Sequence, residues 1–224
     1  DEAQLLSLLD ATVGRQKLDS AEQRVSLAGS HARWAMPAPA TGLQYFEKAD
    51  SMQATIRVGH RAFPRSHPDH YPMQVANTVL GGYFGSRLMK NIREEKGYTY
   101  GIASAWLTMK YDGIFVVQTD VGNEYINPTL AEIKKEMQLL IDKGVTAAEL
   151  DLVRNYMLGR SATGRETPSQ LLSLIQNALI NDFAFDEIDR KHDIMMALRP
   201  KDIQRLAAQY FQPSQLLEVV CGKM

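Results

Sequence analysis

The stretch Leu80-Gly-Gly-Tyr-Phe-Gly-Ser-Arg-Leu-Met-Lys-Asn-Ile-Arg-Glu-Glu-Lys-Gly-Tyr-Thr-Tyr100 carries turn, helix and strand signals in succession. Ser86 is a favourable N-cap, and an apolar stripe at helical spacing follows it. Gly97 predicts the end of that helix, and an aromatic and β-branched strand begins directly after it. The helix is therefore expected to end by placing Arg93 close to Tyr100.

Arg93 and Tyr100 are candidate site residues because a cation and a phenol at one junction can hold a carbonyl or an oxyanion. A structural interpretation stands beside this one. Arg93 could pair with a nearby surface acid such as Glu94, and Tyr100 could be an ordinary half-buried aromatic. Strand alternation places Tyr98, Tyr100 and Ile102 on one face.

The start of the stretch contains three glycines, Gly81, Gly82 and Gly85, at positions where the backbone can need a positive φ. A phosphate-binding loop is an alternative for this segment because Ser86 opens a helix N-terminus. The segment lacks the lysine of a P-loop and a β-α-β setting, so a tight turn between helices is the favoured interpretation.

The order and spacing of several short motifs resemble the second half of the pitrilysin-type zinc peptidases. This family includes insulin-degrading enzyme and the mitochondrial processing peptidase. The motifs are Leu80-Gly81-Gly82, Ser86-Arg87-Leu88, Arg93-Glu94, Gly97-Tyr98-Thr99-Tyr100, Arg199-Pro200, Asp202-Ile203 and Gln209-Tyr210. Each motif is weak alone, and their combination makes the signal specific.

The resemblance implies a substrate-binding half whose zinc lies on another half, in cis or as a separate subunit. It assigns Arg93 and Tyr100, seven residues apart, to catalytic and peptide contacts, with Tyr98, Gly81 and Gly82 as further substrate contacts. Arg87 is expected to buttress the fold. An exposed strand edge is expected to pair with an extended peptide substrate.

The zinc motif of that family, H-x-x-E-H, is absent from the chain. His67-Pro68-Asp69-His70 brings two imidazoles close in sequence, but a zinc site needs three or four converging ligands. A solvated loop at a helix start is the favoured interpretation of this segment. We therefore expect no metal in this chain, zinc on the partner half, and no peptidase activity from the chain alone.

Composition places the chain among ordinary globular proteins, with 224 residues and a net charge of -1. This charge gives no reason to expect nucleic acid as a partner, and no apolar run predicts membrane insertion. The single cysteine, Cys221, is expected to be a buried strand thiol. The compartment stays unknown, with soluble periplasmic and cytoplasmic locations both open. Because the chain starts at Asp1, we expect a processed or excised piece of a longer protein.

The order of strand and helix signals predicts an α+β fold with an antiparallel-rich sheet and helices on one face, like the LuxS and processing-peptidase folds that the resemblance implies. Residues 1–42 are expected to form a helix and linker, the tail of a preceding half, and residues 43–224 the main domain. Predicted strands cover 44–47, 53–61, 98–109, 114–119 and 216–221. Predicted helices cover 2–12, 71–80, 185–198 and 200–210, with three more starting at 127, 146 and 167. Asn127 is the expected N-cap of the first of these three, and Thr146 and Thr167 are expected to open capping boxes in the other two.

Two functions follow from these observations. The first is the peptide-holding half of a zinc endopeptidase, which would also self-associate through its partner surface. The second is a non-catalytic scaffold or partner subunit of the same fold. The sequence does not indicate substrate specificity, oligomeric state, or whether the parent protein is active.

Overall fold

The computed structural model describes residues 2–12, 40–164, 166–181 and 187–223, which fall into two compact units, 1–38 and 39–224. Helix α1 (Glu2–Thr12) is the described part of the first unit. The boundary predicted between residues 42 and 43 stays a prediction. None of the described helices is long and apolar enough to cross a membrane.

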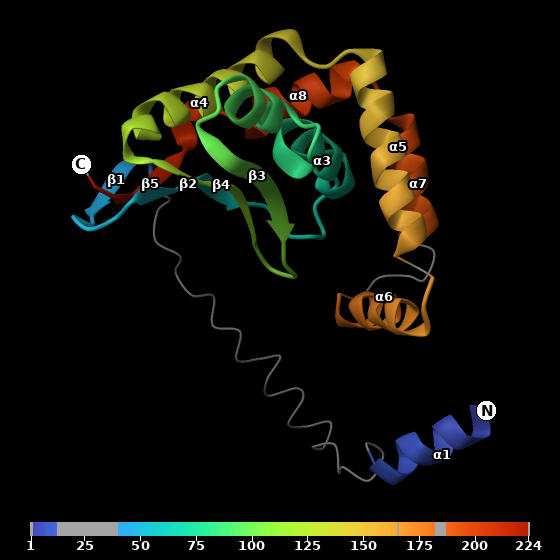
Figure 1. Ribbon diagram of the computed structural model, residues 1–224. Helices are drawn as coiled ribbons and strands as arrows, with labels where there is room; N and C mark the ends of the chain where they lie inside the picture. The colour runs from blue at the N-terminus through green and yellow to red at the C-terminus, as the bar shows by residue number, and fades with distance from the viewer. Residues whose placement is uncertain (1, 13–39, 165, 182–186, 224) are drawn as a thin grey trace. The chain divides into compact units, whose positions relative to one another are not determined.

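A five-stranded sheet with the order β1-β5-β2-β4-β3 forms the centre of the second unit (Figure 1). Every neighbouring pair is antiparallel except β1 and β5, which run parallel. The predicted antiparallel-rich sheet is therefore confirmed. The strands are β1 (Gly42–Glu47), β2 (Gln53–Ala62), β3 (Thr99–Thr108), β4 (Gly113–Gly122) and β5 (Leu217–Gly222).

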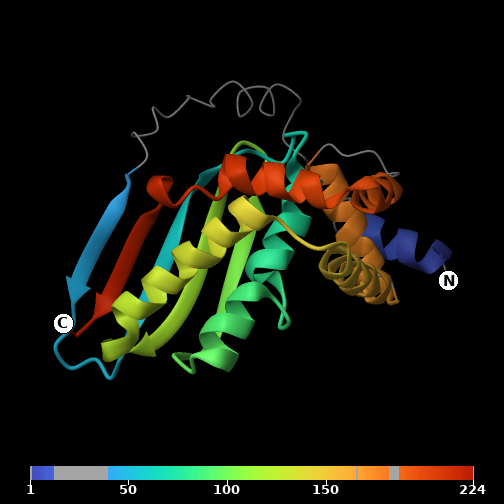
Figure 2. The ribbon, with the colours of Figure 1, turned by 90° about the horizontal axis from the view of Figure 1, so that it is seen from above.

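Helices α3, α4 and α8 cover one face of this sheet, which confirms the predicted α+β layering (Figure 2). The other face carries no helix from the described part of the second unit. The helical elements are α3 (His70–Asn77), η1 (Thr78–Gly82), η2 (Met89–Glu95), η3 (Asn123–Tyr125), α4 (Ile126–Lys143), α5 (Ala147–Thr163), α6 (Pro168–Ile180), α7 (Glu187–Ala197), α8 (Pro200–Tyr210) and η4 (Pro213–Gln215).

The core lies between the sheet and these helices, and strand alternation decides which residues enter it. Ile56 and Val58 of β2 are buried beside Val117 of β4. In β5, Val220 faces the same core, so its neighbour Cys221 lies on the opposite face and is exposed. The expectation of a buried thiol was wrong because the apolar run of β5 did not reveal its face.

Helix starts follow the predicted capping residues in two of three cases. Thr146 caps α5 and Thr167 caps α6, each accepting a hydrogen bond from the backbone N–H three residues later. Only Thr167 forms the reciprocal capping box. Helix α4 begins at Ile126 after the short helix η3, so the predicted N-cap role of Asn127 was wrong.

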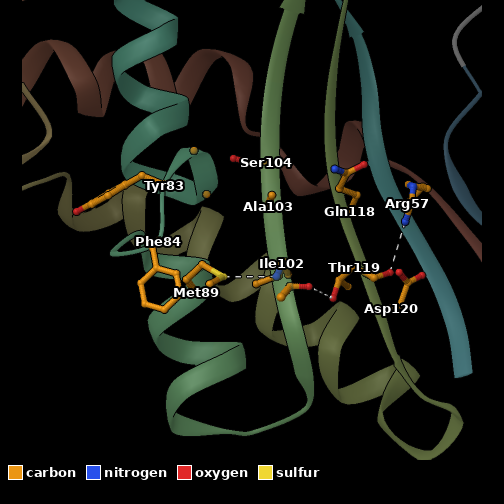
Figure 3. A pocket seen from close by; sticks show the side chains of 13 residues that line it. Arg57, Tyr83, Phe84, Met89, Ile102, Ala103, Ser104, Gln118, Thr119 and Asp120 are labelled. Carbon is orange, nitrogen blue, oxygen red and sulfur yellow. Dashed lines mark hydrogen bonds between the residues drawn. The ribbon is translucent and has the colours of Figure 1, made fainter. Parts of the chain in front are cut away.

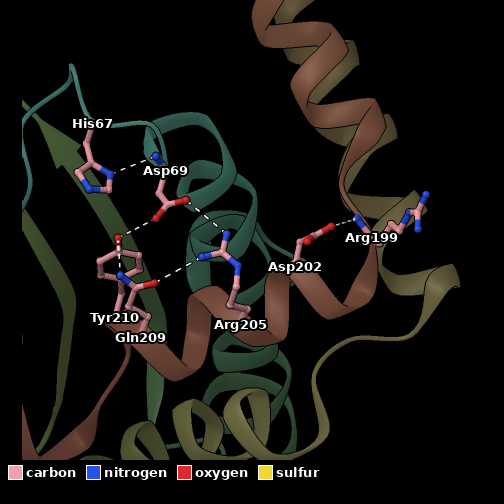
Figure 4. A network of polar contacts seen from close by, with 7 residues as sticks. All are labelled: His67, Asp69, Arg199, Asp202, Arg205, Gln209 and Tyr210. Carbon is pink, nitrogen blue, oxygen red and sulfur yellow. Dashed lines mark hydrogen bonds and ion pairs between the residues drawn. The ribbon is translucent and has the colours of Figure 1, made fainter.

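Helix α8 is tied to the segment before α3 by a polar network around Asp69 (Figure 4). The Tyr210 hydroxyl donates to Asp69 Oδ2 at 2.7 Å, and Arg205 lies 3.4 Å from Oδ1. Burial, and then the Asp69 carboxylate, raises the pKa of Tyr210 to about 12. The family-like Gln209-Tyr210 pair therefore helps to fix α8 on the domain.

The segment from His67 to His70 is a turn at the start of α3, as predicted, but its two histidine rings are packed and not solvated. His67 accepts a hydrogen bond from the Asp69 backbone N–H, and its ring stacks on Phe63 with centroids 4.1 Å apart. His70 is buried and contacts the hydroxyl of Thr108 through Nδ1 at 3.1 Å. Burial lowers the pKa of His70 to about 4, with smaller effects of Arg65 and Lys191 in the same direction.

Candidate functional site

Two π-helical segments, η1 and η2, flank the glycine-rich turn of the organising stretch. The wider turn of η2 is visible where the Lys96 N–H donates to the Asn91 carbonyl at 2.9 Å. Such segments are rare and recur at functional sites. The predicted N-cap bond of Ser86 is absent from the described residues, where its buried Oγ has no hydrogen-bond partner.

The glycines of the stretch serve different purposes. Gly97 has φ +68° and ends the helix as predicted. Gly81, Gly82 and Gly85 do not have positive φ, so that expectation was wrong. At Gly81 the reason for glycine is close approach, because a Cβ there would lie 2.6 Å from Ser104 Oγ and 2.7 Å from Ser104 N. The end of η1 thus packs directly against β3.

Arg93 and Tyr100 do lie together, at the junction of η2 and β3. The guanidinium carbon of Arg93 is 5.4 Å from the Tyr100 ring centroid and 4.5 Å from that of Phe84. Both rings are exposed, Tyr100 at 93% and Phe84 at 64%. Sequence reasoning missed Phe84, although an aromatic residue between the glycines of a turn was an available signal. We call Phe84, Arg93 and Tyr100 the clamp cluster.

A β-bulge presents Tyr100 to solvent. Thr99 lies opposite Val121 and Ile102 opposite Thr119, so two residues of β3 span one residue of β4. The prediction that Tyr100 and Ile102 share a face was wrong for this reason, since Ile102 is buried. The extra residue breaks the alternation that the sequence pattern assumed.

Tyr98, another predicted substrate contact, directly precedes β3 and lies against another ring. It is half-buried and stacks on Tyr125 with centroids 4.8 Å apart. It is outside the set of residues that line the neighbouring cavity. In the structure, the Tyr98 ring therefore packs against Tyr125.

A cavity of about 470 Å³, here called the clamp cavity, lies beside the clamp cluster at β3 (Figure 3). Phe84 and Met89 form part of an apolar wall, and Arg57 and Asp120 lie on the polar side. Its other lining residues are Gly81, Gly82, Tyr83, Gly101, Ile102, Ala103, Ser104, Gln118 and Thr119. The cavity thus joins an apolar and a polar surface beside the half-buried Arg93 and the exposed phenol of Tyr100.

The edge of β3 is partly occupied by side chains of α3. Asn77 Nδ2 donates to the Ser104 carbonyl at 3.2 Å, and Gln74 Nε2 donates to the Trp106 carbonyl at 3.0 Å. A peptide strand could not take both carbonyls without displacing these bonds. The expected pairing of a strand edge with a peptide stays a prediction, and at Ser104 and Trp106 it would require these bonds to α3 to break.

Arg87 buttresses the fold as expected. It forms a bidentate pair with Glu149 on α5, with both N–O distances at 2.8 Å, and donates to the Gly144 carbonyl at 2.7 Å. These contacts fix the start of η2 to the α4–α5 connection. The carboxylate of Glu149 is thereby used in this pair, which explains why α5 lacks the reciprocal capping bond.

Histidine, cysteine and carboxylate side chains do not converge on a metal site among the described residues. No group of three or more of them is placed to hold an ion. In the clamp cluster, the Tyr100 hydroxyl can donate a hydrogen bond and Arg93 carries a positive charge.

Comparison with known proteins identifies related chains. The family model described as the Peptidase M16 inactive domain matches residues 1–157. A Bacillus subtilis protein named uncharacterized zinc protease YmxG is 27% identical over 126 residues, covering 56% of this chain and 31% of the relative. A Helicobacter pylori protein named non-peptidase homolog YmxG is 35% identical over 101 residues, covering 44% and 23%. The aligned parts thus span a third or less of these relatives.

The fold also matches solved structures. The crystal structure of a peptidase M16 inactive domain from Pseudomonas fluorescens superposes with a TM-score of 0.77 at 21% identity. The match covers 84% of this chain and 45% of that chain. It supports the sheet and helix arrangement described above.

Proposed function

Because the chain belongs to the family of M16 peptidase inactive domains, we propose that it holds the peptide substrate of a zinc-bearing partner half. The partner would carry the H-x-x-E-H motif and could be joined in cis or bind in trans. Zinc on that half would supply the metal chemistry of peptide hydrolysis. The present chain would contribute binding and orientation.

The clamp cluster is the observation that carries this proposal. Arg93 forms no ion pair with any described residue, which disfavours the alternative of a surface salt bridge. Its guanidinium lies within cation–π distance of the Phe84 and Tyr100 rings, and such contacts leave its N–H groups able to donate hydrogen bonds to a ligand. Arg93 would donate to a peptide carbonyl, and Tyr100 would donate to the oxyanion at the scissile carbonyl.

Gly81 and Gly82 enter this proposal as lining residues of the clamp cavity. Gly81 is buried against β3, whereas Gly82 is half-buried and its lack of a side chain would let a peptide backbone approach this wall. Tyr98 is proposed as a support for the strand that carries Tyr100. The ring stacking between Tyr98 and Tyr125 would hold that strand in place.

The test is steady-state kinetics of Tyr100→Phe and Arg93→Ala in an enzyme reconstituted from this chain and a zinc-bearing half. Loss of one oxyanion donor costs about 10²–10³ in kcat, so Tyr100→Phe should lower kcat by that factor with little change in KM. Arg93→Ala should raise KM as well, since a carbonyl contact also holds the ground state. Tyr111→Phe, an exposed tyrosine in the β3–β4 turn, is the matched control.

A full kcat for Tyr100→Phe would refute the clamp and favour the second function, a non-catalytic scaffold. The name of the Helicobacter pylori relative, non-peptidase homolog, is the observation in favour of that alternative. Thermal melts of each variant separate a loss of chemistry from a loss of folding. Zinc content of the assembly should not change, since neither residue is expected to bind it.

A further inference from the structure

A second cavity, of about 390 Å³, continues along β3 from the clamp cavity. The two cavities share Gly82 and Ser104, so they lie end to end beside the same strand. Helices α3, α5 and α7 contribute to the second one. Its lining residues are Gln74, Asn77, Thr78, Gly82, Ser104, Ala105, Trp106, Leu107, Tyr156, Met157, Arg160, Ser161 and Lys191.

The second cavity is lined by two basic side chains, Arg160 and Lys191. Among the residues that the structure describes, no aspartate or glutamate lines it. Arg160 is exposed, lies 3.4 Å from the Tyr156 hydroxyl, and forms no ion pair with any residue that the structure describes. The clamp cavity differs, because Asp120 there offsets Arg57.

Two of its lining residues also have buried polar atoms without hydrogen-bond partners in the described part of the chain. Asn77 is 5% exposed, and its Oδ1 has no partner although its Nδ2 is bonded to Ser104. Trp106 Nε1 is likewise unpaired. Unsatisfied buried groups are uncommon in folded proteins, but these two atoms expose no surface to the cavity that their residues line. The polar contact that the cavity offers to a ligand is therefore the exposed Arg160.

We propose that the second cavity binds a carboxylate of the same peptide that the clamp cluster holds, with Arg160 as its main contact. This inference rests on the proposed function, and it adds a substrate class: peptides with an acidic side chain or a free C-terminus at a fixed distance from the clamp. An extended chain from Gly101 to Leu107 covers about 20 Å at 3.3–3.4 Å per residue. The carboxylate would therefore lie several residues from the scissile bond.

The experiment uses fluorescence anisotropy with the intact 224-residue chain and three labelled ten-residue peptides. One carries an internal Glu and a C-terminal amide, one carries Gln and a free C-terminal carboxylate, and one carries Gln and the amide. An exposed ion pair contributes up to about 1 kcal/mol, so a carboxylate should improve binding by up to about fivefold at low salt. High salt should remove that preference.

Arg160→Gln should abolish the preference, and Arg160→Lys should retain part of it. Lys201→Gln removes an exposed cation on α8 outside the cavity and should leave the preference unchanged. The peptide whose affinity falls in Arg160→Gln shows whether the site binds a side-chain carboxylate or a C-terminal carboxylate. Either of these two results supports the carboxylate site.

Equal affinities of the wild-type chain for all three peptides, or no binding of any of them, would overturn the inference. If Arg93→Ala weakens all three equally while Arg160→Gln changes none, the clamp stands and the carboxylate site is wrong. If Arg160 controls the preference but Tyr100→Phe keeps full kcat in the reconstituted enzyme, the carboxylate site stands and the proposed catalytic role fails.

Discussion

Replacing Gly81 by alanine should destabilise the domain, because β3 leaves no room for a methyl group. The new Cβ would lie 2.6 Å from Ser104 Oγ, 2.7 Å from Ser104 N and 2.9 Å from Leu88 Cδ1. The serine hydroxyl could rotate, but the Ser104 backbone nitrogen belongs to a paired strand and cannot yield locally. Overpacking of this kind costs about 1–3 kcal/mol.

An opposing effect has to be considered at the same site. Alanine is favoured over glycine in helical backbone by about 0.5–1 kcal/mol, and Gly81 lies in η1. The clash is the larger effect, so the net loss in the free energy of unfolding should be about 1–2 kcal/mol. For a domain of this size that corresponds to a fall in Tm of about 2–8 °C.

Gly101 provides a matched control because it lines the same cavity and a Cβ there would meet nothing within 4 Å. Its φ is not positive, so Gly101→Ala should be neutral or stabilise by up to about 1 kcal/mol. Urea unfolding and thermal melts of both variants measure the difference. A Gly81→Ala protein as stable as the wild type would show that the close approach to β3 does not explain this glycine.

Two further predictions concern buried polar groups. The pKa of His70 is about 4 in the folded state and 6.5 in the unfolded state. Between pH 4 and 6.5, His70 is therefore protonated in the unfolded chain but neutral in the folded one. Stability should therefore be fully present above pH 6.5 and fall by about 2–3 kcal/mol as pH drops toward 4. His70→Asn should flatten that slope in urea titrations, and an unchanged slope would contradict the assignment. A double-mutant cycle with Arg87→Met and Glu149→Gln should give a coupling free energy of about 1–3 kcal/mol for this ion pair. A coupling near zero would mean that the pair does not fix η2.

Much of the fold was predictable because local pattern and tertiary burial agree. The alternation of β2 placed Ile56 and Val58 in the core, and Thr146 and Thr167 marked the helix starts correctly. The face of Cys221 was not predictable, because the run in β5 is apolar on both sides. Which side is buried depends on the packing of Val220 against the helices.

The proximity of Arg93 and Tyr100 was also predictable, but its geometry was not. The motif spacing placed both residues at one junction. The π-helical turn of η2 and the bulge in β3 come from hydrogen-bond register, which sequence periodicity does not encode. Phe84 was missed for a related reason, because its contact with Arg93 depends on how the glycine-rich turn folds back.

The bulge in β3 also constrains the number of residues between Arg93 and Tyr100. Loss of one residue here would let β3 pair continuously with β4 and turn the phenol toward the opposite side of the sheet. Gain of one residue would shift the phenol relative to Arg93 in the same way. We therefore expect this segment to tolerate amino-acid replacements better than insertions or deletions. In related chains, the spacing of seven residues between Arg93 and Tyr100 should vary less than the identities of the residues between them.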